Sequence, residues 1–447
     1  MKIVTIGAGS IVWGSQVTTD FLLNPNLDGA ELMLMDVNAD SLALVKGYLE
    51  RLVREQSFAK TIRATTDLRE ALKGADYVMV AVSVGGDRLW RYDAMFPQIE
   101  GIYQPVGDTT GPGGLIRSLR HAPVMLEIGR TMLEVSNPGA VMIQLTNPMN
   151  PLCAALEQLE GLTVYGVCHG VNDTEQIFAQ QLGVPPETVR VKAAGNNHNI
   201  FCTQIQVGDE IYTPERFDLI AHRLFDTTFR KEVYERYRGL VGNHSRHPIE
   251  FLPGFLNAES GFGRAWGVEP VPAEIDPFQA PRHDQARMLL ERVMSQPEPI
   301  GWRDDRRHQT LAPDSNGIYQ TGHTREILDD FVVALEQGHD FDIHLNIANQ
   351  GAIAGIGDAF NVEIPVQFRQ GRLVRPAITF NAEITQVISR VAQEQYLIAQ
   401  ACLEFNQDLL VEALSLDALV PSREVAERLV REMVSFQANY ILTKAFL

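Results

Sequence analysis

Cys168 and His198 are the residues of this 447-residue chain whose types and places suggest metal chemistry. Cys168 comes directly after an apolar run, residues 164–167, and His198 follows another apolar run about one strand–helix unit later. A thiolate and an imidazole can share a divalent ion, and two protein ligands leave positions open for substrate oxygens. Taken alone, each residue is better explained structurally, the cysteine as a buried small residue and the histidine as a core residue. Together they predict a catalytic metal site.

A second candidate is the glycine-rich segment 107–114 (GDTTGPGG), which carries the carboxylate of Asp108. Arg117 and Arg120 follow it on a predicted helix. One interpretation is an Asx turn that caps this helix. The other is an acid or base on a pocket loop, with an arginine that orients the substrate or the carboxylate itself.

The N-terminus has the pattern of a dinucleotide-binding turn. The β-branched run 2–6 ends at Gly7 and Gly9, and a helical pattern follows. Such glycines let the backbone approach a pyrophosphate, which the helix N-terminus then binds. Val12 stands where the usual third glycine would be, so a purely structural turn is the alternative. Asp36 ends the second predicted strand and favours NAD over NADP, because its carboxylate would bind ribose hydroxyls and repel a phosphate.

The elements that must position these residues alternate between strand and helix. This alternation predicts an α/β fold with a Rossmann-type, doubly wound parallel sheet. Residues 1–195 are the predicted NAD-binding domain, and residues 196–447 a mixed α+β domain for substrate and metal binding and for oligomerisation. Asn147 follows the run 141–145, where it could bind sugar hydroxyls or the nicotinamide ribose, although turn chemistry alone also explains Asn-Pro. Predicted strands are 2–6, 30–35, 75–84, 141–145 and 164–167; predicted helices are 12–23, 382–414 and 422–442.

Composition restricts the partners. The formal charge is −18, which argues against nucleic acid because such binding depends on phosphate neutralisation. An anionic substrate would therefore need a local arginine, histidine or metal. We expect no export signal and no bilayer-spanning segment. Four scattered cysteines fit a reducing cytoplasm better than a disulfide framework.

In number and order, these motifs resemble the NAD- and metal-dependent glycosidases of glycoside hydrolase family 4, whose fold is related to lactate and malate dehydrogenases. The resemblance covers nearly the whole chain. The matching segments are 7–10, 84–86, 107–114, 146–149, 168–170, 197–198, and 346 with 349–353.

The resemblance implies a reaction and a role for each site residue. NAD+ removes hydride from C3 of the sugar, a base takes the C2 proton, the aglycone is eliminated, water adds, and the hydride returns. The metal, usually Mn2+, stabilises the charge that develops on the sugar oxygens. The implied roles are metal ligands Cys168 and His198; acid Asp108; cofactor-binding Gly7, Gly9, Ser10, Asp36, Val84, Gly85 and Asn147; and substrate-binding Asn147, His169, Asn197, Arg246 and His247.

The chain departs from many relatives at Ser245, where they carry an aspartate before the Arg-His pair. A serine hydroxyl is not a useful base at neutral pH without an activating partner. His244, Tyr234 and Tyr237 are therefore the candidates for the C2 base. Asn196, where many relatives have an apolar residue, is a second departure. Both suggest altered substrate recognition.

Within the family, segments 101–108 and 246–254 look most like members that act on α-galacturonides. A guanidinium binds a planar carboxylate through two bonds, so Arg246 is the expected partner of the C6 carboxylate. The open alternatives are an α-glucosidase, an α-galactosidase or a sulfonated-sugar glycosidase, then an NAD-dependent 2-hydroxy acid dehydrogenase; a catalytically inactive nucleotide sensor is least favoured. We expect a homodimer or homotetramer.

Overall fold

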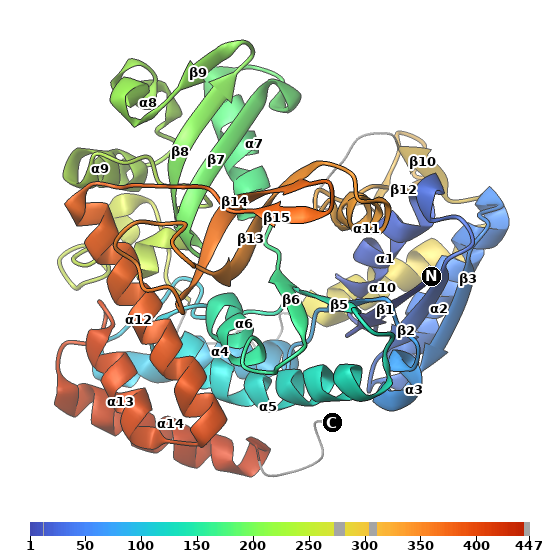
Figure 1. The fold of residues 1–447 in the computed structure, drawn as a ribbon, viewed down its shortest axis with the longest axis horizontal. Helices are drawn as coiled ribbons and strands as arrows, with labels where there is room; N and C mark the ends of the chain where they lie inside the picture. The colour runs from blue at the N-terminus through green and yellow to red at the C-terminus, as the bar shows by residue number, and fades with distance from the viewer. Residues whose placement is uncertain (12, 272–281, 304–310, 442–447) are drawn as a thin grey trace.

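The computed structural model describes residues 1–11, 13–271, 282–303 and 311–441. Its first half is a parallel sheet with the strand order β3-β2-β1-β4-β5-β6 (Figure 1). The chain order reverses between β1 and β4, which is where such folds open a ligand crevice at the carboxyl ends of the strands. These strands are β1 (Lys2–Ile6), β2 (Glu31–Met35), β3 (Thr61–Thr65), β4 (Tyr77–Val80), β5 (Val141–Gln144) and β6 (Thr163–Gly166).

The second half continues the same sheet with antiparallel strands. β6 pairs with β13, and the order then runs β14-β7-β8-β9, with β15 paired to β14. A separate small sheet is built from β10, β11 and β12. These strands are β7 (Val189–Asn196), β8 (Asn199–Val207), β9 (Glu210–Tyr212), β10 (Gly301–Arg303), β11 (Ala312–Pro313), β12 (Tyr319–Gly322), β13 (Phe341–Ala348), β14 (Asn361–Arg369) and β15 (Arg372–Val374).

Several helices begin at capping side chains. Asn38 accepts the backbone N–H of Ser41 where α2 begins, and Asn381 accepts that of Ile384 where α12 begins. Each bond satisfies an N–H that the helix itself cannot pair. The helices are α1 (Gly14–Leu23), α2 (Ala39–Gln56), α3 (Leu68–Leu72), α4 (Gly86–Met95), α5 (Gly111–Val135), α6 (Met149–Leu156), α7 (Gly170–Leu182), α8 (Ala221–Leu224), α9 (Thr228–Tyr237), α10 (Arg282–Ser295), α11 (Leu328–Gln337), α12 (Ala382–Glu404), α13 (Gln407–Leu416) and α14 (Arg423–Ile441).

Both faces of the parallel sheet are covered. Ile3 and Val4 are adjacent in β1 but belong to different hydrophobic cores, because successive strand residues point to opposite faces. One core includes residues of α1, α2, α10 and α11; the other includes α3 and α5 with the C-terminal helices α12 to α14. Figure 1 shows these C-terminal helices beside α5, so the end of the chain returns to the first half.

The predicted α/β fold with a Rossmann-type parallel sheet is confirmed. The helix predicted over 382–414 is two helices, because Phe405 adopts a left-handed conformation (φ +54°) and Asn406 caps α13. Residue 12, where we expected α1 to begin, lies outside the described residues. The domain boundary after residue 195 remains a prediction; it falls near the end of β7, which pairs with β8 along its length.

Candidate active site

A cavity of about 1750 Å³ lies along the carboxyl ends of the parallel strands. It exceeds the roughly 300–1,000 Å³ of ordinary small-molecule sites, so it has room for more than one ligand. The predicted site residues that line it are Gly7, Gly9, Ser10, Asp36, Val84, Asp108, Asn147, Cys168, His169, His198, Arg246 and His247.

The turn after β1 has no space for a side chain at Gly7 or Gly9. Gly7 has a φ of +84°, and a Cβ there would lie 2.1 Å from the carbonyl oxygen of Ala81. A Cβ at Gly9 would lie 2.7 Å from Cγ of Asp36, whose Oδ2 accepts the Gly9 N–H at 2.9 Å. The backbone is therefore exposed to the cavity at the switch point, and the Asp36 carboxylate is fixed beside it.

Gly14 is a further glycine beside this turn that the sequence pattern did not single out. A Cβ at Gly14 would lie 2.3 Å from the carbonyl oxygen of Ala8, so only glycine allows α1 to approach the turn this closely. In the usual fingerprint the third glycine provides this close packing. Its signal was a glycine at the start of the helical pattern, two residues after Val12.

The loop after β4 is held by hydrogen bonds to side chains of α5. The backbone N–H of Val84 donates to Nε2 of His121 at 2.9 Å, and Nε of Arg120 donates to the Val84 carbonyl at 3.3 Å. Gly85 has a φ of +80° and caps α4, and it is not among the described residues that line the cavity. Val84, rather than Gly85, forms the wall here.

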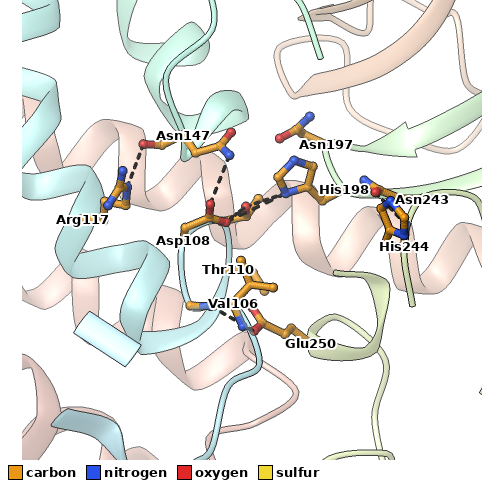
Figure 2. Close-up of polar contacts among 12 residues, drawn as sticks. Val106, Asp108, Thr110, Arg117, Asn147, Asn197, His198, Asn243, His244 and Glu250 are labelled. Carbon is orange, nitrogen blue, oxygen red and sulfur yellow. Dashed lines mark hydrogen bonds and ion pairs between the residues drawn. The ribbon is translucent and has the colours of Figure 1, made fainter. Parts of the chain in front are cut away.

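Asp108 lies at the centre of the polar contacts in Figure 2. Its Oδ2 accepts the amide of Asn147 at 3.3 Å, and its Oδ1 accepts the hydroxyl of Thr109 at 2.6 Å. That hydroxyl oxygen also lies 2.8 Å from Nδ1 of His198. Asp108 is thus held by its neighbour Thr109 and by Asn147 from the loop after β5, and it lines the cavity.

Arg117 lies behind this carboxylate on α5. It donates to the Asn147 carbonyl at 3.2 Å and to the Ser83 hydroxyl at 3.2 Å. Burial lowers its pKa, although the negative charge of Asp108 acts in the opposite direction. Of the two arginines singled out in sequence, Arg117 borders the cavity, whereas Arg120 forms a buried ion pair with Asp93.

The two expected metal ligands come from different loops. Cys168 follows β6, and His198 lies in the turn between β7 and β8 with a φ of +67°. Burial raises the pKa of the Cys168 thiol well above its ordinary value, and burial lowers that of His198 to about 4. Among the described residues, the donor atoms grouped with those of His198 belong to Asp108 and His247, and the three lie within 4.8 Å of one another. Cys168 lines the same cavity but is not part of this group. Soft and imidazole donors at one cavity are suited to a divalent transition ion.

His169 is held between two carboxylates. Its Nδ1 lies 3.2 Å from Glu326, and its Nε2 lies 3.4 Å from Asp173. Burial opposes the charged form, but the negative charge of Glu326 and Asp173 prevails and raises the pKa of His169 to about 9. A cationic imidazole therefore lines the cavity.

Asn197 does not reach the cavity wall. Its side chain is fully buried, donates to Oε2 of Glu363 at 2.9 Å and hydrogen-bonds Cys168. Its backbone N–H donates to Asn150 at 2.6 Å. The Asn197 side chain therefore contacts Cys168 and Glu363 on the side away from the cavity. This position differs from the substrate-binding role that was expected for Asn197.

Arg246 and His247 line the cavity, whereas His244 and Ser245, which precede them in the chain, do not. The described residues offer the Arg246 guanidinium no hydrogen bond or ion pair, and Arg246 is exposed. The His244 side chain is 54% exposed, with Nε2 3.6 Å from Asp173, outside the lining residues. The hydroxyl of Ser245 lies 2.9 Å from that of Thr227.

The two tyrosines proposed as bases lie on α9. The hydroxyl of Tyr234 donates to Asp218 at 2.6 Å, and its pKa is raised to about 12, chiefly by burial. Tyr237 is half-buried, and neither tyrosine is among the described residues that line the cavity. The structure therefore does not bring Tyr234, Tyr237 or His244 to the cavity.

Comparison with known proteins decides the family. The sequence model of the Family 4 glycosyl hydrolases matches residues 2–184, and that of their C-terminal domain matches residues 193–420. The chain belongs to glycosyl hydrolase family 4. The predicted family and the predicted enzyme class, a glycoside hydrolase, are confirmed.

Relatives within family 4 differ in their named substrates. An alpha-galactosidase of Rhizobium meliloti is 27% identical, with 98% of this chain and 89% of that protein covered. An alpha-galacturonidase of Thermoanaerobacterium saccharolyticum is 25% identical, with 99% and 96% covered. The crystal structure of a 6-phospho-alpha-glucosidase from gut microorganisms, in complex with NAD and Mn2+, shares the fold with a TM-score of 0.75 at 18% identity and 98% coverage of both chains.

Among the described helices, none combines the length and the apolar character needed to cross a membrane.

Proposed function

We propose that this chain is an NAD+- and Mn2+-dependent glycosidase that cleaves an α-glycoside of an acidic sugar, with an α-galacturonide favoured. The observation that carries the proposal is a single cavity that joins the glycine turn, the carboxylate of Asp108 and the donors Cys168 and His198. Family 4 enzymes are an exception to the hydrolases that use two carboxylates. One carboxylate beside a nucleotide turn and metal donors fits that exception.

The residues present fit both cofactors. Gly7 and Gly9 leave backbone, not side chains, facing the space where a pyrophosphate would approach α1. Cys168 and His198 supply a thiol and an imidazole for the ion. When bound, NAD+ would supply reversible hydride transfer at C3 of the sugar, and the ion would supply a Lewis acid for the neighbouring sugar oxygens; together they would make the C2 proton acidic.

Asp108 has the role of the acid. Its carboxyl group would deliver a proton to the glycosidic oxygen as the bond from C1 to that oxygen breaks. The contacts with Thr109 and Asn147 fix its orientation. A correctly oriented group is needed because a misplacement of about 1 Å can reduce a rate by roughly 100-fold.

Arg246 supports an acidic substrate. Arg246 lines the cavity, the described residues offer its guanidinium no hydrogen bond or ion pair, and a planar carboxylate can accept two bonds from such a group. The cationic His169 adds positive charge locally, although the whole chain has a formal charge of −18. A neutral α-galactoside is the second candidate, because the alpha-galactosidase relative is slightly more similar than the alpha-galacturonidase.

We also propose that the enzyme works in the cytoplasm as a homodimer or homotetramer. The four cysteines are free, and a metal-binding thiol at Cys168 requires reducing conditions.

The test is release of p-nitrophenol from matched α-glycosides under reducing conditions, with NAD+ and Mn2+ each present or withheld. We expect turnover only with both, and preference for the galacturonide over the galactoside. Arg246→Met should lower kcat/KM for the galacturonide by about 100-fold, within the range for a charge-assisted bond, and leave the galactoside within about 3-fold. Equal losses on both sugars would assign Arg246 another role, and turnover without NAD+ would contradict the proposed function.

A further inference from the structure

Glu250 is a fully buried carboxyl group that reaches from the second half of the chain to the loop carrying Asp108. It ends a short 3-10 helix, Pro248–Glu250, and is 1% exposed. Its Oε1 accepts the backbone N–H of Val106 at 2.6 Å and that of Gly107 at 3.0 Å. Figure 2 shows Glu250 beneath the loop, on the side of Val106, with Asp108 above it.

Gln104 extends this contact to the far end of the loop. Its Nε2 donates to Oε2 of Glu250 at 3.1 Å and to the Thr110 carbonyl at 3.0 Å, and its Oε1 accepts the N–H of Gly113 at 3.0 Å. Both ends of the Asp108 loop, residues 106–113, are thus bonded to one buried pair, Gln104 and Glu250. Gln104 is itself fully buried.

Gln104 and Glu250 hold the backbone of the loop, whereas the Asp108 carboxylate is held separately by Thr109 and Asn147. Neither Gln104 nor Glu250 is among the described residues that line the cavity, so neither touches the substrate space. Gly107 has a φ of +63°, and a Cβ there would lie 3.0 Å from that of Ala94, so the loop also has little room to shift. The direction of the Asp108 side chain depends on this backbone.

We propose that Glu250 is a positioning residue that holds Asp108 in place for protonation of the leaving group. This inference rests on the proposed function. Both oxygens of Glu250 accept N–H groups: Oε1 accepts those of Val106 and Gly107, and Oε2 accepts that of Gln104. With glutamine at 250, one oxygen could still accept from Val106 and Gly107, but the NH2 group would face the NH2 group of Gln104. Gln104 cannot reverse its amide, since both of its ends are already bonded.

The test compares substrates with good and poor leaving groups. A p-nitrophenyl glycoside needs little help from an acid, whereas a methyl glycoside needs it fully. For Glu250→Ala we expect kcat to fall by about 100-fold or more on the methyl glycoside and by less than about 10-fold on the p-nitrophenyl glycoside. Glu250→Gln should show the same pattern more weakly, and Asp108→Asn should show it most strongly. Equal losses on both substrates would overturn the positioning role.

A second measurement does not depend on turnover. Hydrogen–deuterium exchange of the full-length protein without substrate should show faster exchange of residues 104–113 in Glu250→Ala, and the rest of the chain unchanged. The matched control is Glu175→Ala, which removes a carboxylate that accepts the N–H of Val191 at 2.9 Å, away from the loop. It should change neither the loop exchange nor the leaving-group pattern.

Hydrogen–deuterium exchange tests the positioning role of Glu250, and NAD+-dependent cleavage by the wild-type protein tests the proposed function. Unchanged exchange in residues 104–113 would overturn the inference even if the enzyme proves to be an NAD+-dependent glycosidase. Absence of NAD+-dependent cleavage in the wild-type protein would overturn the proposed function, and with it the acid role, whatever the exchange shows.

Discussion

His198, a proposed metal ligand, has an unusual backbone conformation. Its φ of +67° lies in the left-handed region, which costs roughly 1–2 kcal/mol for a residue with a Cβ. The residue persists there because it lies in the tight turn where Asn196 of β7 faces Asn199 of β8. Strain of this kind is commonly found where a side chain must be aimed at a site. Here it directs an imidazole to Asp108 and His247.

Substitution of Cys168 tests its proposed role as a metal ligand. Cys168→Ser should weaken Mn2+ binding by at least about 10-fold, because a serine hydroxyl remains protonated at neutral pH. A loss of about 10-fold is already common when a residue that only supports a metal ligand is changed. Isothermal titration calorimetry under reducing conditions measures Mn2+ binding. His247→Asn is the comparison, because His247 lies in the donor cluster around His198. Unchanged Mn2+ affinity in the serine variant would show that the ion binds the other donors.

The sequence allowed residues to be placed near one another where each one directly follows a strand of the parallel sheet. Asp36, Asn147 and Cys168 line one cavity because carboxyl ends of parallel strands share an edge. It could not place Tyr234 or His244. Their positions depend on α9 and on the irregular segment after it, whose path is set by packing rather than by a repeating pattern. The role of Glu250 was also hidden, since its partners are far away in the chain.

At the scale of elements, the turn between β1 and α1 depends on three glycines. Gly7 and Gly9 were predicted from the sequence pattern, and Gly14 emerges from the distance between α1 and the Ala8 carbonyl. The spacing differs from the usual fingerprint, so a fixed motif would overlook it. The close approach lets the N-terminus of α1 face the cavity.

Gly14→Ala tests this packing. The added Cβ would overlap the Ala8 carbonyl, so we expect a loss of about 1–3 kcal/mol in the free energy of unfolding and weaker NAD+ binding. Gly47→Ala in α2 is the matched control, because its Cβ would meet the nearest atom, of Met294, at an ordinary 3.7 Å. Alanine there should be neutral or stabilising by up to about 1 kcal/mol. Thermal unfolding and NAD+ titration of both variants measure the difference, and equal behaviour would contradict the role of Gly14.

The parallel strands were predictable as elements, but β13 and β14 were not identified. Both alternate apolar and polar residues, as in Ile343, Leu345 and Ile347 of β13, which is a period-2 signal that was present. Their place in the sheet could not be predicted, because β6 and β13 pair over a long sequence separation.

At the scale of the whole molecule, one sheet passes from parallel to antiparallel pairing between β6 and β13. Cys168 follows the last parallel strand and His198 lies on the antiparallel side, so the candidate metal site straddles this change. The C-terminal helices return to cover the parallel half. The two halves therefore share a sheet, a core and a site, and the homo-oligomer expected from the sequence remains a prediction.

Removal of the C2 proton distinguishes the proposed glycoside cleavage from simple hydrolysis. The most direct measurement is cleavage of the α-galacturonide in D2O with NAD+ and Mn2+, followed by NMR of the released sugar. We expect deuterium at C2 of the product without accumulation of NADH. Cleavage with hydrogen retained at C2 would contradict this expectation and indicate simple hydrolysis.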